Sequence, residues 1–351
     1  MIEPKQLETI ITEKRNHLRT DRLDMSFGEL INLYEEGTLF INPEYQRSFR
    51  WDKVRQTKFI ESILLGIPVP PIFIAEDKEA KWELVDGLQR ISTILAFFGI
   101  LKNVPEAKNN LYLTPGGIVR ELEGYTINSL SPLLKFTIKR AVCRVEIVKW
   151  DSIVDMRYEL FNRLNTLGEP LSEQEIRNCI FRDDGNEFNQ ILIDIGNSGD
   201  FKNIIRPTDK QIDQMYCQEL VLRFFTLKHC GWDFITIQDH MTQFMEKVTK
   251  KALSFDFNHE QQHLLRLITY LKQHADDQIF RATNGNFAPA YYDIVMLGLD
   301  IFYDRYKDKP DLFIQKVKQA KEEATFDKVA TYSSSKRTKQ RIETALEILG
   351  K

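Results

Sequence analysis

The sequence predicts an α+β first half followed by an all-helical second half, with the boundary near residue 170. Short alternating runs typical of strands occur among helical segments in the first half. After a capping motif at residues 172–175, almost every segment has helical apolar spacing. We therefore expect one domain over residues 1–170 and a helical domain over residues 171–351.

The elements of the first domain are predicted from caps, turns and apolar spacing. Ser26 and Glu29 form the pattern of a capping box, in which a hydroxyl and a carboxylate satisfy free amides at a helix start. Asp52 is expected to cap a helix that ends near Leu65, with Gly66 just past its end. The other predicted elements are an extended segment 38–41, strands 72–75 and 82–86, a helix 88–98, a strand 143–149 and a helix 152–162.

The second domain is predicted to contain only helices. Ser172 and Glu175 again form the pattern of a capping box, which predicts a helix start directly after the domain boundary. Further helices are predicted at residues 211–228, 237–250, 259–273, 290–306 and 340–349.

Composition and charge are those of an ordinary globular protein. The 351 residues are 42% hydrophobic and 28% charged, which excludes disordered and fibrous architectures. The formal net charge of −3 argues against a surface covered with nucleic-acid-binding charge, but it leaves room for a local basic groove. No membrane span or signal peptide is visible, and the four cysteines form no CxxC pair, so we expect a cytoplasmic protein with reduced thiols.

The most informative stretch is LVDGLQRIST at residues 84–93, where an Asp-Gly turn joins a predicted strand to a predicted helix. A helix N-terminus presents unpaired amides and the positive end of the dipole, which suits an anion. Gly87 would let the backbone approach a ligand, Arg90 can fork two hydrogen bonds onto phosphate oxygens, and Thr93 adds a hydroxyl. Asp86 is expected to orient Arg90, hold a metal ion or position a water. The alternative is an Asp-Gly turn followed by an Arg–Glu surface pair.

Two other polar clusters lie in the first domain. Residues 41–51 interleave arginines with aromatic residues, among them Tyr45, and such a set can hold phosphate and stack a base. Residues 161–172 contain Asn165 and Arg163, which can face a ligand from the domain junction. The alternatives are aromatic residues that pack in the core and an asparagine that caps a helix.

The C-terminal part of the chain is locally basic. Residues 316–341 contain eight Lys and Arg residues against three acidic ones. Residues 332–339 are expected to form a polar loop before the last helix, where cations and hydroxyls suit a DNA or nucleotide phosphate. The alternative is a solubilising helix. The predicted DNA-binding residues are Lys336, Arg337, Lys339 and Arg341.

A zinc motif is matched but is not expected to bind metal. Residues 259–263 read H-E-x-x-H, whose spacing places both imidazoles on one helix face. We expect Asn258 to cap this helix and leave His259 on its exposed first turn. No glutamate follows until Glu322 to serve as third ligand. No metal site is therefore predicted, and a zinc peptidase is kept only as a third hypothesis.

Together and in this order, four stretches resemble the N-terminal domain family of GmrSD-type modification-dependent restriction enzymes. They are the Tyr-Gln-Arg stretch after a proline, the helix ending SILLGIPVPPI, the Asp-Gly-x-Gln-Arg turn with its threonine, and the segment FNRLNTLGEPLS. The resemblance covers roughly residues 25–180. It implies a ParB/sulfiredoxin-like fold that binds and hydrolyses nucleoside triphosphates, coupled to cleavage of modified phage DNA. Sulfiredoxin chemistry is not expected, because Gly87-Leu88-Gln89 contains no cysteine.

The resemblance also implies which residues handle the nucleotide. These are Gln46, Arg47, Asp86, Gly87, Gln89, Arg90 and Thr93, to which the residue types add Tyr45 and Asn165. Among them we expect Asp86, Gln89 and Arg90 to be catalytic, with Mg²⁺ as the cofactor.

Many fused relatives carry an HNH-type nuclease domain, whose site needs histidines and an asparagine around a metal. The histidines of the second half do not occur in such a pattern. We therefore expect a stand-alone NTP-hydrolysing DNA sensor whose nuclease lies on a separate chain; a homo-oligomer is left open. One alternative is a non-catalytic module in which nucleotide binding switches DNA binding on or off. The other is a chain that is itself a DNA nickase or endonuclease.

Overall fold

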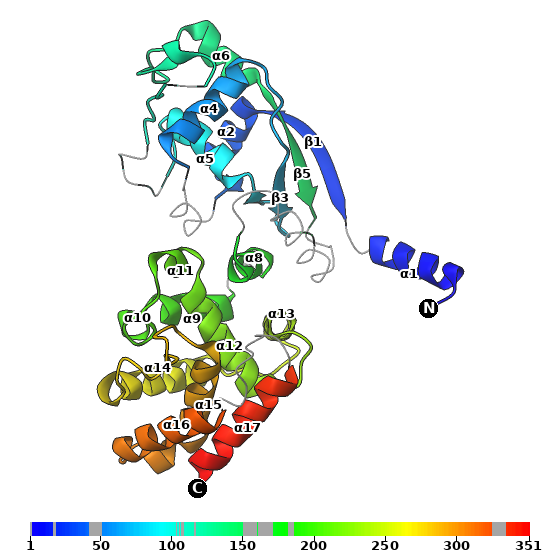
Figure 1. Ribbon diagram of the computed structural model, residues 1–351. Helices are drawn as coiled ribbons and strands as arrows, with labels where there is room; N and C mark the ends of the chain where they lie inside the picture. The colour runs from blue at the N-terminus through cyan, green and yellow to red at the C-terminus, as the bar shows by residue number, and fades with distance from the viewer. Residues whose placement is uncertain are drawn as a thin grey trace. The chain divides into compact units, whose positions relative to one another are not determined.

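The computed structural model describes residues 2–16, 19–41, 51–102, 104, 106, 109–115, 117–149, 160, 171–181, 186–324 and 335–351. The chain divides into two compact units, Met1–Leu171 and Ser172–Lys351 (Figure 1). The first unit contains a sheet and helices, and the second is helical. The predicted fold class is therefore confirmed.

A five-stranded sheet organises the first unit. Its strands are β1 (Thr20–Ser26), β2 (Leu39–Phe40), β3 (Ile72–Glu76), β4 (Trp82–Asp86) and β5 (Val142–Val148). They lie in the order β1-β5-β3-β4-β2. The pairs β1–β5 and β3–β4 are antiparallel, whereas β3–β5 and β2–β4 are parallel. The predicted strands β3, β4 and β5 are confirmed to within one residue at each end.

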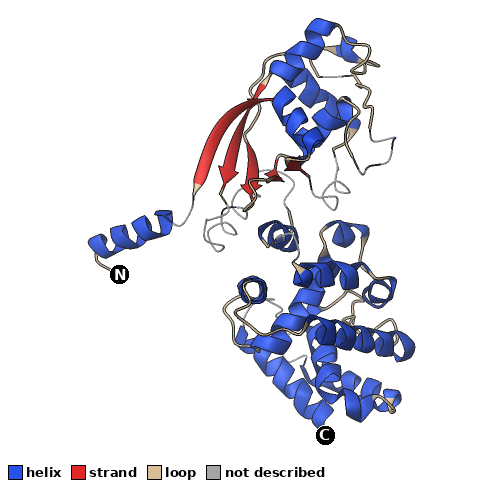
Figure 2. Cartoon of the chain, turned by 180° about the vertical axis from the view of Figure 1, so that it is seen from behind, coloured by secondary structure: helices blue, strands red, loops and turns tan. Residues whose placement is uncertain are grey.

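Helices gather against one face of this sheet (Figure 2). The helical elements of the unit are α1 (Pro4–Asn16), α2 (Phe27–Glu36), α4 (Lys53–Leu64), α5 (Leu88–Phe97), the 3₁₀ turn Arg120–Leu122 and α6 (Pro132–Arg140). Ser26 and Asp52 are the predicted N-caps, and each side chain accepts a hydrogen bond from an amide three residues on. Alternate residues of β3 and β5, such as Ile72 and Val145, are fully buried and form the sheet side of the core. The predicted helix 152–162 lies outside the described residues.

The second unit consists of helices around α12. They are α8 (Glu173–Ile180), α9 (Glu187–Asn197), α10 (Gly199–Ile205), α11 (Asp209–Asp213), α12 (Tyr216–Cys230), α13 (Ile237–Thr249), α14 (Phe257–His274), α15 (Pro289–Tyr306), α16 (Pro310–Ala324) and α17 (Ser335–Gly350). Buried rings of Phe188, Phe225 and Phe244 join α9, α12 and α13, with centroids of Phe188 and Phe244 5.6 Å apart.

Three predictions for the second unit are wrong in detail. The helix predicted at 211–228 is two helices, because Met215 adopts a left-handed conformation (φ 56°). Asp256, not Asn258, caps α14. The last helix begins at Ser335 rather than at residue 340, so the expected loop residues 335–339 are helical.

No helix among the described residues is long and apolar enough to cross a membrane.

Candidate functional site

The turn between β4 and α5 is the centre of the predicted site. Gly87 caps α5 with φ 98° and ψ 11°, a left-handed conformation that favours glycine. A Cβ atom built on Gly87 would lie 2.5 Å from Cγ2 of Ile72. The glycine is therefore required both by its backbone angle and by its close approach to β3. Because Gly87 has no side chain, no side-chain cap occupies the N-terminus of α5.

An ion pair closes this turn. Arg90 Nη2 donates to Asp86 Oδ2 at 2.9 Å, and Nη1 donates to the Pro70 carbonyl at 3.0 Å. The Arg90 side chain is 13% exposed, whereas that of Asp86 is 43% exposed. Of the roles predicted for Asp86, the geometry places it where it orients Arg90. The Arg–Glu surface pair of the alternative interpretation is not what forms, since the partner is Asp86.

The thiol of Cys143 lies close to the Pro70 carbonyl that Arg90 contacts. Its Sγ is 3.9 Å from the Pro70 oxygen, and the residue is fully buried on β5. Burial raises the pKa of the Cys143 thiol, and the positive charge of Arg90 opposes this only in part. The thiol is therefore protonated at neutral pH, which does not suit thiolate chemistry at this turn.

Gln89 and Thr93 use their polar groups within the protein. Gln89 Oε1 accepts a hydrogen bond from the Trp51 amide at 3.0 Å. The Thr93 hydroxyl donates to the Gln89 carbonyl at 2.6 Å, and Thr93 is fully buried. The structure thus brings Asp86, Gly87, Gln89 and Arg90 together but directs the Thr93 hydroxyl into the helix. This placement does not support the prediction that Thr93 faces a phosphate.

The residues that flank the Tyr-Gln-Arg stretch lie near this turn. Ile41 follows β2, which runs parallel to β4, so both strands lead to the same edge of the sheet. Trp51 is bonded to Gln89 in the first turn of α5. The predicted nucleotide-binding residues Tyr45, Gln46, Arg47 and Asn165 themselves lie outside the described residues.

A metal site formed by protein ligands alone is not evident. Within the described part of the chain, no group of three or more His, Cys, Asp and Glu side chains could hold a metal ion. Asp86 is the exposed carboxylate at the turn, and a carboxylate combined with substrate phosphates is a usual setting for Mg²⁺.

The histidines of the H-E-x-x-H motif take part in a mixed ion network. His263 Nε2 lies 2.7 Å from Asp300 Oδ1, and Lys228 Nζ contacts both Glu260 at 2.8 Å and Asp300 at 3.1 Å. His259 is 68% exposed. Burial raises the pKa of Glu260, but His229 and Lys228 outweigh it and lower the pKa to about 2. Glu260 is therefore a carboxylate paired with a lysine, which is not the arrangement of a zinc peptidase.

The predicted DNA-binding residues lie on α17. Arg337 and Lys339 are exposed, and the side chain of Lys336 lies outside the described residues. Arg341 is only partly exposed, and its Nε atom is buried with no acceptor among the described residues. Burial lowers the pKa of the Arg341 guanidinium, which Asp293 opposes. Arg341 therefore points toward the body of the unit rather than joining the exposed cations.

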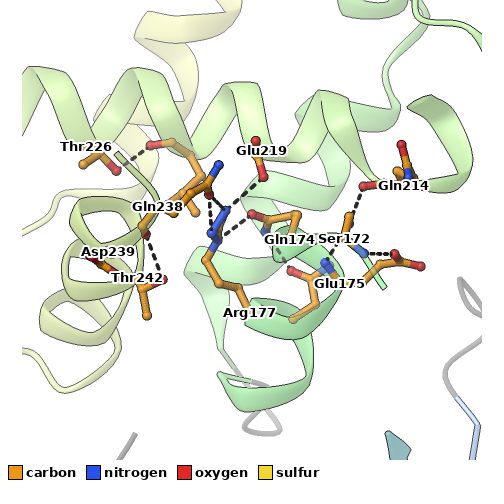
Figure 3. A network of polar contacts seen from close by, with 12 residues as sticks. Ser172, Gln174, Glu175, Arg177, Gln214, Glu219, Thr226, Gln238, Asp239 and Thr242 are labelled. Carbon is orange, nitrogen blue, oxygen red and sulfur yellow. Dashed lines mark hydrogen bonds and ion pairs between the residues drawn. The ribbon is translucent and has the colours of Figure 1, made fainter. Parts of the chain in front are cut away.

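One polar network was not anticipated from the sequence (Figure 3). Arg177 on α8 is fully buried, and its guanidinium donates to Gln174 at 3.1 Å, to Gln238 at 2.9 and 3.1 Å, and to Glu219 at 3.0 Å. At the start of α8, Ser172 donates to the carbonyl of Gln214. The available signal was the i, i+3, i+4 spacing of Gln174, Arg177 and Asn178, which is equally typical of a solvent-facing stripe.

The fold and the turn together define an α+β domain with a strand–glycine–helix turn, followed by a helical unit. Residues 27–182 match the family model described as the GmrSD restriction endonuclease, N-terminal domain. This match confirms the resemblance of that part of the chain to the family and indicates a restriction-system component. Neither a curated protein nor a solved structure matches the chain.

Proposed function

We propose that this chain is the nucleoside triphosphate-binding and hydrolysing, DNA-sensing component of a modification-dependent restriction system. The observation that carries the proposal is the Asp86–Arg90 turn, which lies at the N-terminus of α5 inside a domain of the restriction family. Helix N-termini and arginine are general means of holding phosphate.

Each residue of the turn has a distinct part in this proposal. The first amides of α5 and the Arg90 guanidinium hold phosphate oxygens, and the bonds that Arg90 donates to Asp86 and to the Pro70 carbonyl fix the guanidinium beforehand. Gln46 and Arg47 add donors and positive charge from the neighbouring stretch, and Tyr45 and Asn165 complete the binding set. Asp86, which is partly exposed, positions the attacking water or a ligand of Mg²⁺. When bound, Mg²⁺ supplies charge neutralisation for the phosphates.

Two partners are proposed. One is DNA, including modified DNA, and the other is a nuclease on a separate chain. The exposed cations Arg337 and Lys339, with Lys336, form the proposed DNA contact on α17, whereas Arg341, which points toward the body of the unit, is left out of it. Contacts of this kind are made to the phosphate backbone, so they weaken steeply as the salt concentration rises.

A second function, a nucleotide-operated switch without turnover, is favoured by one observation. Asp86 is bonded to Arg90, so the carboxylate is partly committed to holding the turn rather than to activating water. In that case nucleotide binding would change the DNA affinity of the chain, but phosphate would not be released.

The test is phosphate release from each of the four ribonucleoside triphosphates with Mg²⁺, with and without phage DNA, alongside nucleotide binding. The variants are Arg90→Lys and Asp86→Asn, and the control is Asp24→Asn, which removes the exposed cross-strand pair to Arg144 elsewhere on the sheet. We expect both turn variants to lose turnover and the control to keep it. Binding without turnover in the wild type supports the switch, and absence of binding refutes both functions.

A further inference from the structure

The outer edge of β1 is open. β1 is the end strand on one side of the sheet, and its seven residues pair with β5 in an unbroken register (Figure 1). In an antiparallel ladder only alternate residues direct their N–H and C=O groups toward one neighbour, so the others present theirs at the outer edge. Proteins usually protect such an edge with proline, lysine, a bulge or a very short strand. The strand TDRLDMS uses none of these devices.

The side chains of β1 alternate between a charged face and an apolar one. Arg22 forms an ion pair with Glu146 of β5 at 2.9 Å. On the same face, Asp24 forms an ion pair with Arg144 of β5 at 3.1 Å. Leu23 points to the opposite face and is 41% exposed although it is apolar. The edge therefore presents a cation and an anion on one face and a half-exposed leucine between them on the other.

A second copy of β1 matches this edge in one antiparallel register. Opposite residues of a sheet share a face, so a two-fold axis perpendicular to the sheet must pass beside one central residue. An axis at Arg22 or at Asp24 would bring two like charges together. An axis at Leu23 places Arg22 of each copy opposite Asp24 of the other and sets the two leucines side by side. Only this register also pairs all seven residues of the strand.

We propose that two copies of this chain join their β1 strands in this register, so that two five-stranded sheets continue into one. Each row of exposed side chains across the interface then alternates in sign, because the β5 partner of each charged residue has the opposite charge. An edge that only protects the sheet would carry one sign and repel a copy. β5 and β3 lie between β1 and β4, so the proposal does not involve the Asp86–Arg90 turn and does not rest on the proposed function.

Charge reversal tests the register. Arg22→Asp and Asp24→Arg each place like charges opposite one another, so we expect each to raise the dimer dissociation constant about tenfold. An equimolar mixture of the two variants restores opposite charges and should associate as the wild type does. The double variant Arg22→Asp with Asp24→Arg should also associate as the wild type does. Sedimentation equilibrium measures all four, and circular dichroism checks that each variant is folded.

The double variant separates association from the stability of the single chain. It opposes both ion pairs to β5 within one chain, so a role in monomer stability alone predicts that it is the most damaged of the three variants. The control is Glu146→Gln, which removes one of these pairs, leaves the charges of β1 unchanged and should keep the dimer. A double variant that associates no better than the single variants would overturn the proposed register.

Amide hydrogen exchange shows whether β1 itself is the contact. The amides of β1 that point outward should exchange more slowly as the protein concentration rises, whereas those bonded to β5 should be protected at every concentration. A wild-type chain that stays monomeric at every concentration would refute the proposal and leave the edge to a strand of another protein. A dimer in which the outward amides exchange as fast as in the monomer would refute it as well.

Discussion

Gly87→Ala tests whether the turn geometry, rather than a glycine of any kind, supports the site. Gly87 and Gly37 share nearly the same backbone, with φ 98° and ψ 11° for Gly87 and φ 80° and ψ 10° for Gly37. Their surroundings differ. A Cβ on Gly87 would lie 2.5 Å from Ile72 Cγ2 and 3.3 Å from Arg90 Nη2, whereas a Cβ on Gly37 would meet no atom within 4 Å. Gly37→Ala is therefore a matched control.

The expected magnitudes follow from these two differences. An alanine in the left-handed region costs about 1–2 kcal/mol at either position. At Gly87 the clash with a buried side chain of β3 adds the cost of overpacking, about 1–3 kcal/mol, since Ile72 is fully buried and must shift. The Arg90 guanidinium must also move, which disturbs its bonds to Asp86 and Pro70. We expect a total loss of about 2–5 kcal/mol for Gly87→Ala and about 1–2 kcal/mol for Gly37→Ala.

The assay is urea unfolding of the full chain, followed by tryptophan fluorescence and circular dichroism. Triphosphate binding is measured on the folded protein below the transition. Gly87→Ala should lose both stability and binding, and Gly37→Ala should lose stability alone. Equal losses of stability in the two variants would show that the contact with Ile72 is not limiting. Wild-type binding in folded Gly87→Ala would refute the link between this turn and the nucleotide.

Two further predictions concern buried charges. Burial raises the pKa of Glu61, but hydrogen bonds from the amides of residues 117–119 outweigh it, and the net pKa is lowered. Glu61→Gln should lower the free energy of unfolding by about 2 kcal/mol at pH 7. This loss relative to the wild type should shrink below about pH 4.5, as the wild-type carboxylate protonates. The measurement is urea unfolding at several pH values, and a loss that grows on acidification would contradict the prediction. Arg177→Met should lower the free energy of unfolding by about 3 kcal/mol, because it leaves Glu219 and Gln238 without their donor. Glu219→Gln should lower it by less, because the guanidinium keeps its other acceptors. Equal losses of the free energy of unfolding in the two variants would contradict this.

The centre of the first unit could be predicted from local sequence alone. The apolar run of β3, the strand β4 and the Asp-Gly turn before α5 each have a local physical signal, and all three form as expected. The edge strand β1 has no such signal, because its sequence TDRLDMS is largely polar and its first five residues are exposed. It pairs with β5 through main-chain bonds and through the cross-strand ion pairs Arg22–Glu146 and Asp24–Arg144. Such pairs depend on a partner more than one hundred residues away.

The candidate site was predictable in its residues but less so in their roles. The residue type of Thr93 and the family resemblance for Gln89 suggest that both face a phosphate, yet Gln89 accepts from Trp51 and Thr93 donates to a main-chain carbonyl. Threonine in a helix often bonds back to the carbonyl four residues earlier, and sequence spacing does not reveal which partner it takes. The break at Met215 was missed for a similar reason, because a non-glycine residue in the left-handed region has no sequence signature.

The position of α8 shows why a sequence family and a folded unit need not end at the same residue. The family match continues to residue 182, but α8 belongs to the unit that begins at Ser172. Its polar stripe, whose spacing is equally typical of a solvent-facing helix, is the face by which it is held, since Arg177 bonds to Glu219 of α12 and Gln238 of α13. A buried arginine without these acceptors would be strongly unfavourable. The last helix of the family segment is therefore held by side chains of the helical unit.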